Sequence, residues 1–137
     1  MAVIVDANVA LKWVIDEDGS EAARRLVAEE TLAAPDLMFI ECANVLCTKV
    51  RRGLISETTS RLALDAILAS PIRAISARPS IGAAQIIALE LRQRAYDSLY
   101  LAIAITEHAT LVTADERFAR AALAHPVYAR SLRLLGA

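Results

Sequence analysis

The sequence predicts one α/β domain, a three-layer α/β/α sandwich around a mainly parallel sheet of four to five strands. Short apolar runs rich in β-branched residues alternate with longer segments whose apolar residues recur every three or four positions. This alternation is typical of buried parallel strands joined by right-handed helical crossovers. No linker, repeat or low-complexity tract interrupts the 137 residues, so a single domain over residues 1–137 is expected.

Strands are expected at four short segments, and a fifth segment at the end of the chain is considered below. Residues 2–5 form a continuous apolar run that stops at Asp6, as expected of a strand buried on both faces. Residues 32–34, 72–75 and 111–113 have the same character. The final segment, 127–135, fits either an edge strand or a frayed helix, and strand is favoured for its first half.

Helices are expected between these strands, at boundaries set by capping and helix-breaking residues. Asp36 is expected to cap a helix that continues to about Arg52 and ends at Gly53. Ser56 should begin the next helix, which Pro71 cannot continue. The other expected helices run through 22–27, from 79 to about 92, from near residue 96 with an entirely apolar stretch at 99–105, and briefly after residue 115.

Several side chains in these helices are expected to be buried. The expected core contacts are Leu62, Leu64, Ile67 and Leu68 in one helix and Ala83, Ile86, Ile87 and Leu91 in another. Cys42 and Cys47 are five residues apart, which does not place them on one helix face, so they are expected to be buried thiols. Trp13, Tyr96 and Tyr100 are expected to be core or dimer contacts rather than base-stacking groups.

Charge and hydropathy restrict the class of protein. The formal net charge of −1 argues against a protein that coats nucleic acid by bulk electrostatics, so RNA contact would need a local basic patch. The longest apolar run is far shorter than the ~20 residues of a membrane-spanning helix, and Asp6 interrupts the first apolar segment before it resembles an export signal. We therefore expect a soluble, cytoplasmic protein with no membrane contact. Candidate RNA-positioning residues are Lys12, Arg24, Arg25, Lys49, Arg51 and Arg52.

Four acidic residues are expected to meet at one edge of the sheet. Asp6 and Asp115 lie at or just beyond the ends of predicted parallel strands, at the edge where open α/β sheets place ligands. Asp97 opens the helix that leads into the strand at 111–113, and Glu41 lies early in the helix that follows Pro35. Both helices should begin at that same edge, so all four carboxylates are expected to converge there.

Crowded carboxylates repel one another, which raises their pKa values unless a cation neutralises them. Mg²⁺ or Mn²⁺ prefers oxygen ligands and usually keeps several waters, so one or two direct carboxylates would suffice. No His or Cys cluster in the sequence suggests zinc instead. A divalent cation here could lower the pKa of a bound water, orient a phosphodiester and neutralise developing charge, which is the chemistry of phosphoester hydrolysis.

Four sequence motifs resemble the PIN domains, and most closely the VapC-like toxins of prokaryotic toxin–antitoxin pairs. The motifs are Val5-Asp6-Ala7-Asn8, Pro35-Asp36 followed by Glu41 and Asn44, the string from Ala95 to Ala102, and the string from Val112 to Phe118. The resemblance implies a metal-dependent endoribonuclease that is commonly dimeric and is inhibited by a small antitoxin whose tail enters the acidic site. It also implies that Asp6, Glu41, Asp97 and Asp115 are the catalytic and metal-binding acids, with Asn8 and Thr113 as supporting hydrogen-bonding residues.

One departure from the family pattern bears on the number of metal ions. Some relatives carry a further acid a few residues after the position of Asp115, where this chain has Ala119. Glu116 is the substitute candidate, but its adjacency does not determine where its side chain points. A single Mg²⁺ is therefore expected, and a second metal ion is left open.

Two alternative functions remain at this stage. A phosphohydrolase of the aspartyl-phosphate type would also place an Asp after the first strand, but it typically needs a second Asp at the position of Asn8. The other alternative is a catalytically silent PIN-like module that only binds RNA or a partner protein. The presence of all four acids counts against that module.

Overall fold

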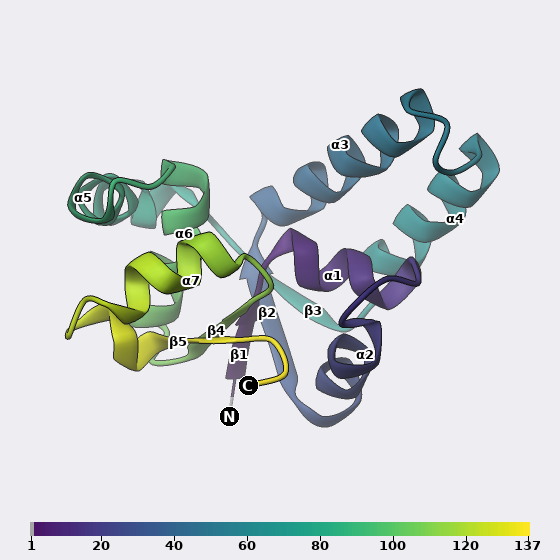
Figure 1. Ribbon diagram of the computed structural model, residues 1–137. Helices are drawn as coiled ribbons and strands as arrows, with labels where there is room; N and C mark the ends of the chain where they lie inside the picture. Colours follow the sequence, from purple (N-terminus) through teal and green to yellow (C-terminus); the bar gives the residue numbers. More distant parts are fainter. Residues whose placement is uncertain (1) are drawn as a thin grey trace.

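A five-stranded parallel sheet forms the middle layer of the protein (Figure 1). The computed structural model describes residues 2–137. The strands are β1 (Ala2–Val5), β2 (Thr31–Pro35), β3 (Ile72–Ile75), β4 (Thr110–Thr113) and β5 (Leu132–Leu134), in the order β3-β2-β1-β4-β5. All neighbouring pairs are parallel. The expected α/β architecture with a parallel sheet is confirmed.

Helices cover both faces of the sheet (Figure 1). One layer contains α1 (Ala7–Val14), α2 (Ser20–Glu29), α3 (Leu37–Arg51) and α4 (Glu57–Leu68), and the other contains α5 (Ile81–Leu91), α6 (Ala95–Thr106) and α7 (Glu116–Leu123). The chain moves from β1 to β3 in one direction across the sheet and then returns to β4 and β5, so right-handed crossovers place the later helices on the opposite face. Among residues 2–137, no helix has the length and apolar character needed to cross a membrane.

The core lies on both faces of the sheet, where the central strands pack against α6 on one side and against α1 and α3 on the other. Ile4 and Val5 of β1 and Val112 of β4 are fully buried. Seven consecutive residues of α6, from Ser98 to Ala104, are also buried. The burial of these residues agrees with the prediction that this helix is apolar on every face. The packing of α6 against the sheet also holds the start of α6 beside the ends of β1 and β4.

Two elements differ from expectation. Helix α1 was not expected, because Asp6 was interpreted only as the end of a strand; it also caps α1 by accepting a hydrogen bond from the Val9 N–H at 2.9 Å. At the C-terminus, the first half of 127–135 is a 3₁₀ helix, Tyr128–Ser131, and only the second half is strand. The prediction of strand for the first half of this segment was therefore wrong. Val127 has helical dihedral angles, and extended backbone begins only at Leu132.

Several predicted side-chain environments were also wrong. In α4, Ile67 is buried as expected, but Leu62 and Leu68 are largely exposed and Ala63 is buried in their place. In α5, Ile87 is buried as expected, but Ala83 and Ile86 are exposed, and Ala84 and Ala88 complete the buried face. Both helices have apolar residues on more than one face, so their spacing does not select the face that packs.

Capping and cysteine predictions were partly correct. Asp36 precedes α3 as expected, but its backbone is already helical and its side chain makes no capping hydrogen bond. Both cysteines are free, as expected, yet only Cys42 is buried, and Cys47 is exposed.

Candidate functional site

The candidate site lies at the carboxyl ends of β1 and β4, on either side of the point where the strand order reverses direction. A cavity of about 10 Å³ opens there, with room for about one water molecule. Three of the four predicted acids line it, which brings together residues from the start, the middle and the end of the chain. Its lining is Asp6, Asp97, Tyr100, Leu111, Thr113, Asp115 and Phe118.

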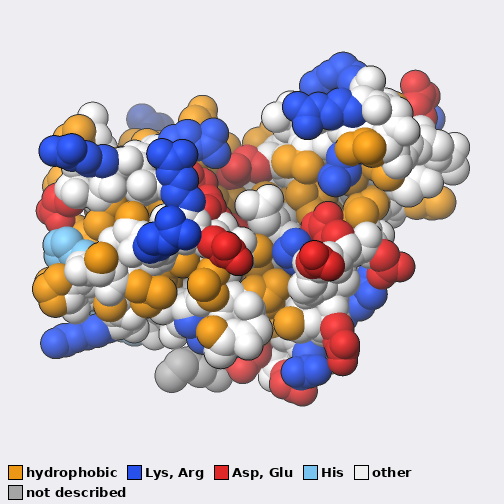
Figure 2. All heavy atoms as spheres, in the orientation of Figure 1, with side chains coloured by type: hydrophobic (Ala, Val, Ile, Leu, Met, Phe, Trp, Pro, Cys, Tyr) orange, Lys and Arg blue, Asp and Glu red, His pale blue; other side chains and the backbone are white. Residues whose placement is uncertain are grey.

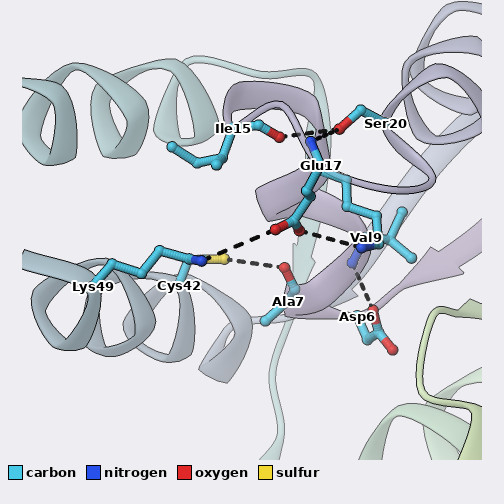
Figure 3. Close-up of polar contacts among 9 residues, drawn as sticks. Asp6, Ala7, Val9, Ile15, Glu17, Ser20, Cys42 and Lys49 are labelled. Carbon is cyan, nitrogen blue, oxygen red and sulfur yellow. Dashed lines mark hydrogen bonds and ion pairs between the residues drawn. The ribbon is translucent and has the colours of Figure 1, made fainter. Parts of the chain in front are cut away.

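Both carboxylate oxygens of Asp6 are held by protein donors. Oδ1 accepts from the Val9 N–H, and the close-up shows this bond at the junction of β1 and α1 (Figure 3). Oδ2 accepts a short hydrogen bond from the Thr113 hydroxyl, and the same hydroxyl oxygen accepts from the Asp115 N–H at 3.0 Å. Thr113 therefore joins the end of β4 to Asp6 and orders the backbone of Asp115.

The two later aspartates begin helices. Asp115 is the N-cap of α7, and its Oδ1 accepts from the Phe118 N–H at 3.0 Å. Asp97 lies in the first turn of α6, where Oδ2 is 3.4 Å from Nε of Arg94. In both residues, the position at the start of a helix directs the carboxylate toward the edge of the sheet. Because helix starts can be recognised in the sequence, the positions of both aspartates could be predicted.

Glu41 reaches the site through a residue that sequence reasoning assigned only to the core or a dimer contact. The Tyr100 hydroxyl, on α6, donates a hydrogen bond of 2.6 Å to Glu41 Oε1, on α3. Tyr100 lines the small cavity and is 3% exposed. Asp97 and Tyr100 are three residues apart and therefore share a face of α6, a spacing that could have identified Tyr100.

Burial raises the pKa values of three of the acids. Burial raises the pKa of Asp6 to about 6, against the opposing hydrogen bonds from Thr113 and Val9, and the nearby charge of Asp115 adds to the rise. Burial also raises the pKa of Glu41, with a smaller contribution from the charge of Asp97. Burial raises the pKa of Asp97 too, although Arg94 opposes this, and Asp115 again adds to it. Besides burial, the charge of Asp115 therefore acts on Asp6 and Asp97, and the charge of Asp97 acts on Glu41.

The oxygen-rich lining agrees with the chemistry of a Mg²⁺ site rather than a zinc site. Within residues 2–137, no group of three or more His, Cys, Asp or Glu side chains is arranged to hold a metal ion. Mg²⁺ usually takes only one or two carboxylates and keeps several waters, so the aspartates that line the cavity would supply enough protein oxygens for it. The nearby Cys42 donates weakly to the Ala7 carbonyl (Figure 3), and burial raises its thiol pKa to about 12, so it offers no thiolate.

Two predicted participants lie outside the small cavity. Asn8, on the first turn of α1, and Glu116, on the first turn of α7, are both exposed. In the part of the chain that the structure describes, neither contributes to the lining. Glu41 is also outside that lining and is connected to it through Tyr100.

Comparison with known protein families gives one match that covers most of the chain. The family model described as the PIN domain matches residues 3–123. The chain belongs to the PIN-domain family. This PIN domain is 34% identical over 117 residues to "Ribonuclease VapC9" of Mycobacterium tuberculosis, covering 84% of this chain and 87% of the relative.

Solved structures show the same fold at lower sequence identity. PAE2754 from Pyrobaculum aerophilum superposes with a TM-score of 0.71 at 21% identity, covering 88% of this chain and 79% of the other. A toxin–antitoxin complex from Klebsiella pneumoniae gives a TM-score of 0.57 at 16% identity, covering 82% and 86%. At these identities the match concerns the PIN fold.

Proposed function

We propose that this PIN domain is an endoribonuclease that hydrolyses RNA phosphodiesters with Mg²⁺, or with Mn²⁺ in its place. The proposal is carried by the three aspartates that line one small cavity at the switch point of the sheet, with Glu41 joined to that cavity through Tyr100. The relative with 34% identity is named a ribonuclease, which supports RNA as the substrate.

The local environment of each acidic residue would determine its role in the reaction. Asp6 is held by two donors, so its carboxylate would be presented in one orientation, with Asp97 and Asp115 facing the same cavity. When bound there, Mg²⁺ would lower the pKa of a coordinated water and neutralise charge on the phosphodiester. Glu41, whose burial raises its pKa and whose orientation Tyr100 holds, would accept the proton from the attacking water.

We further propose that the protein is the toxin of a toxin–antitoxin pair and acts in the cytoplasm. The likeness to a toxin–antitoxin complex supports a small protein antitoxin as partner. A homodimer is proposed as well, supported by exposed apolar residues on α5 and at the start of α6, among them Ile81, Leu89 and Tyr96. An apolar groove of about 490 Å³ adjoins them, and its lining includes Ile81 and Tyr96.

The two alternative functions have less support. An aspartyl-phosphate phosphohydrolase would need a second acid at position 8, where the exposed Asn8 stands. A silent PIN-like module would have no need to keep three acids whose pKa values burial raises, because each buried carboxylate is unfavourable for folding at neutral pH.

Cleavage of a mixed RNA pool by the purified protein tests the proposal, with Mg²⁺, with Mn²⁺ and with a chelator. Asp6→Asn should abolish cleavage, whereas Asp65→Asn, the same change at an exposed site on α4, should not. Metal-dependent cutting by the wild type and by Asp65→Asn alone would support the nuclease. Cutting that persists in chelator, or in Asp6→Asn, would contradict it.

A further inference from the structure

A second, larger groove adjoins the acidic cavity. It has a volume of about 560 Å³ and shares Asp97 and Asp115 with the small cavity. Three arginines supply the rest of its charge, two from the connection between α5 and α6 and one from the first turn of α7. The full lining is Arg92, Gln93, Arg94, Asp97, Asp115 and Arg117. Basic side chains gather beside acidic ones over α6 and α7 in Figure 2.

Two of these arginines have no acidic partner among residues 2–137. Arg94 pairs with Asp97, but within residues 2–137 neither Arg92 nor Arg117 takes part in an ion pair. Both are exposed beside the acids. Their guanidinium groups are therefore available to an anion that reaches the site.

Several basic residues expected from the sequence to position RNA are, in contrast, paired with acids. Lys12 and Lys49 both contact Glu17, and Figure 3 shows that carboxylate between α1 and α3. Arg24 pairs with Asp16, at 2.6 Å, and Arg25 with Glu21, at 3.4 Å. The available positive charge beside the acids therefore lies on the groove rather than on α1 and α2.

The backbone at Arg92 adds a second observation. Arg92 ends α5 with φ of 55° and ψ of 44°, in the left-handed region that favours glycine. A non-glycine residue held in this region is uncommon, and such residues gather at functional sites. This left-handed turn ends α5 and begins the segment of Arg92, Gln93 and Arg94, all of which line the groove.

We propose that Arg92 and Arg117 form a phosphate-binding cradle for single-stranded RNA, next to the phosphodiester placed at Asp97 and Asp115. This rests on the proposed nuclease function. Four acids repel a polyanion, and two guanidinium groups on the rim of their site would offset that repulsion and fix the strand's register. Arginine suits this task because its planar fork binds two phosphate oxygens at once. Arg94 is left out of the cradle because it is already paired with Asp97, at 3.4 Å.

Equilibrium binding of a labelled single-stranded RNA oligonucleotide over a range of salt concentrations tests the cradle. The Asp6→Asn protein serves as the cleavage-deficient reference, and Arg92→Gln with Arg117→Gln is added to it. The matched control adds Arg61→Gln with Arg120→Gln, which removes the same charge from exposed sites outside the groove. Circular dichroism and thermal unfolding establish that all three proteins are folded.

The groove variant should bind RNA at least about tenfold more weakly at low salt. Its slope of log affinity against log salt should be shallower by about 1.4, since each phosphate contact to a single strand contributes about 0.7. The control should keep the reference slope. Equal slopes in both variants, or no measurable RNA binding by the reference, would overturn the cradle.

A kinetic comparison separates failure of the cradle from failure of the proposed function. In the wild-type background, Arg92→Gln with Arg117→Gln should raise KM about tenfold and change kcat little. Cleavage by the wild type with an unchanged KM in the variant would overturn the cradle and leave the nuclease standing. Absence of cleavage by the wild type, with the difference in salt slopes present, would overturn the nuclease and leave the RNA cradle standing.

Discussion

The Tyr100 hydroxyl donates a 2.6 Å hydrogen bond to Glu41 Oε1 and so joins α6 to α3 across the edge of the sheet. The two helices belong to opposite layers of the sandwich (Figure 1). Burial raises the pKa of Tyr100, so the phenol remains a donor, and Glu41 is held facing the other acids. The fourth acid is therefore positioned by a tertiary contact rather than by its own helix.

Tyr100→Phe removes this hydrogen bond and keeps the ring. We expect unfolding free energy to fall by about 1–2 kcal/mol, since the acceptor is charged and half-buried. RNA cleavage should fall about tenfold because Glu41 loses its fixed orientation. Denaturant unfolding and cleavage rates measure both effects. Tyr96→Phe, at an exposed position on the same helix, is the control and should alter neither. An unchanged cleavage rate in Tyr100→Phe would show that Tyr100 does not position Glu41 for cleavage.

Thr113→Val removes the hydroxyl that donates to Asp6 and accepts from the Asp115 N–H. Both groups would lose a partner in a buried site, so we expect a loss of about 1–3 kcal/mol in unfolding free energy. The pKa of Asp6 should rise further, because this hydrogen bond opposes the effect of burial. NMR titration of the Asp6 carboxyl measures the second effect. Thr113→Ser keeps the hydroxyl and should restore the wild-type pKa of Asp6. If it does not, the packing of the Thr113 methyl group, rather than the hydrogen bond, determines that pKa.

The raised pKa of Asp6 predicts a pH-dependent difference in stability. The folded pKa of about 6 exceeds the reference value of 3.8, so the folded state binds more protons between these values. The contribution of Asp6 is therefore most favourable below about pH 4 and is lost as pH rises through 6. In chelator, Asp6→Asn should gain on the wild type by about 2 kcal/mol between pH 4 and pH 7. Denaturant unfolding at each pH measures the gain, and Asp65→Asn should show none. If the stability of Asp6→Asn relative to the wild type falls as pH rises, the prediction is contradicted.

Sequence patterns predicted the edge of the sheet that carries the acids, because the positions of Asp6 and Asp115 follow from where strands end. Helix starts similarly located Asp97 and Glu41. The contact that orients Glu41 was not predicted, since it depends on how α3 and α6 pack across the sheet edge. Arg92 and Arg117 were missed for a similar reason: α6 and β4 separate them in sequence, and only the return of the chain to the same edge brings them together.

Helix faces were the least predictable part of the fold. Apolar residues surround much of α5, so the expected burial of Ile86 was as consistent with the pattern as the observed burial of Ala84 and Ala88. Helix α1 was missed because Asp6 both ends a strand and caps a helix. A test for capping at the end of each strand would have found it, since Asp is a favoured N-cap.

We propose that Asp6, Glu41, Asp97 and Asp115 act together as one cation site for RNA cleavage. Electron paramagnetic resonance can count the bound Mn²⁺ per chain on the same samples that are assayed for cleavage. We expect one Mn²⁺ per wild-type chain, loss of both binding and cleavage in Asp6→Asn and Asp97→Asn, and retention of both in Asp65→Asn and Glu116→Gln. Cleavage without bound metal, or Mn²⁺ binding that survives Asp6→Asn and Asp97→Asn unchanged, would contradict it.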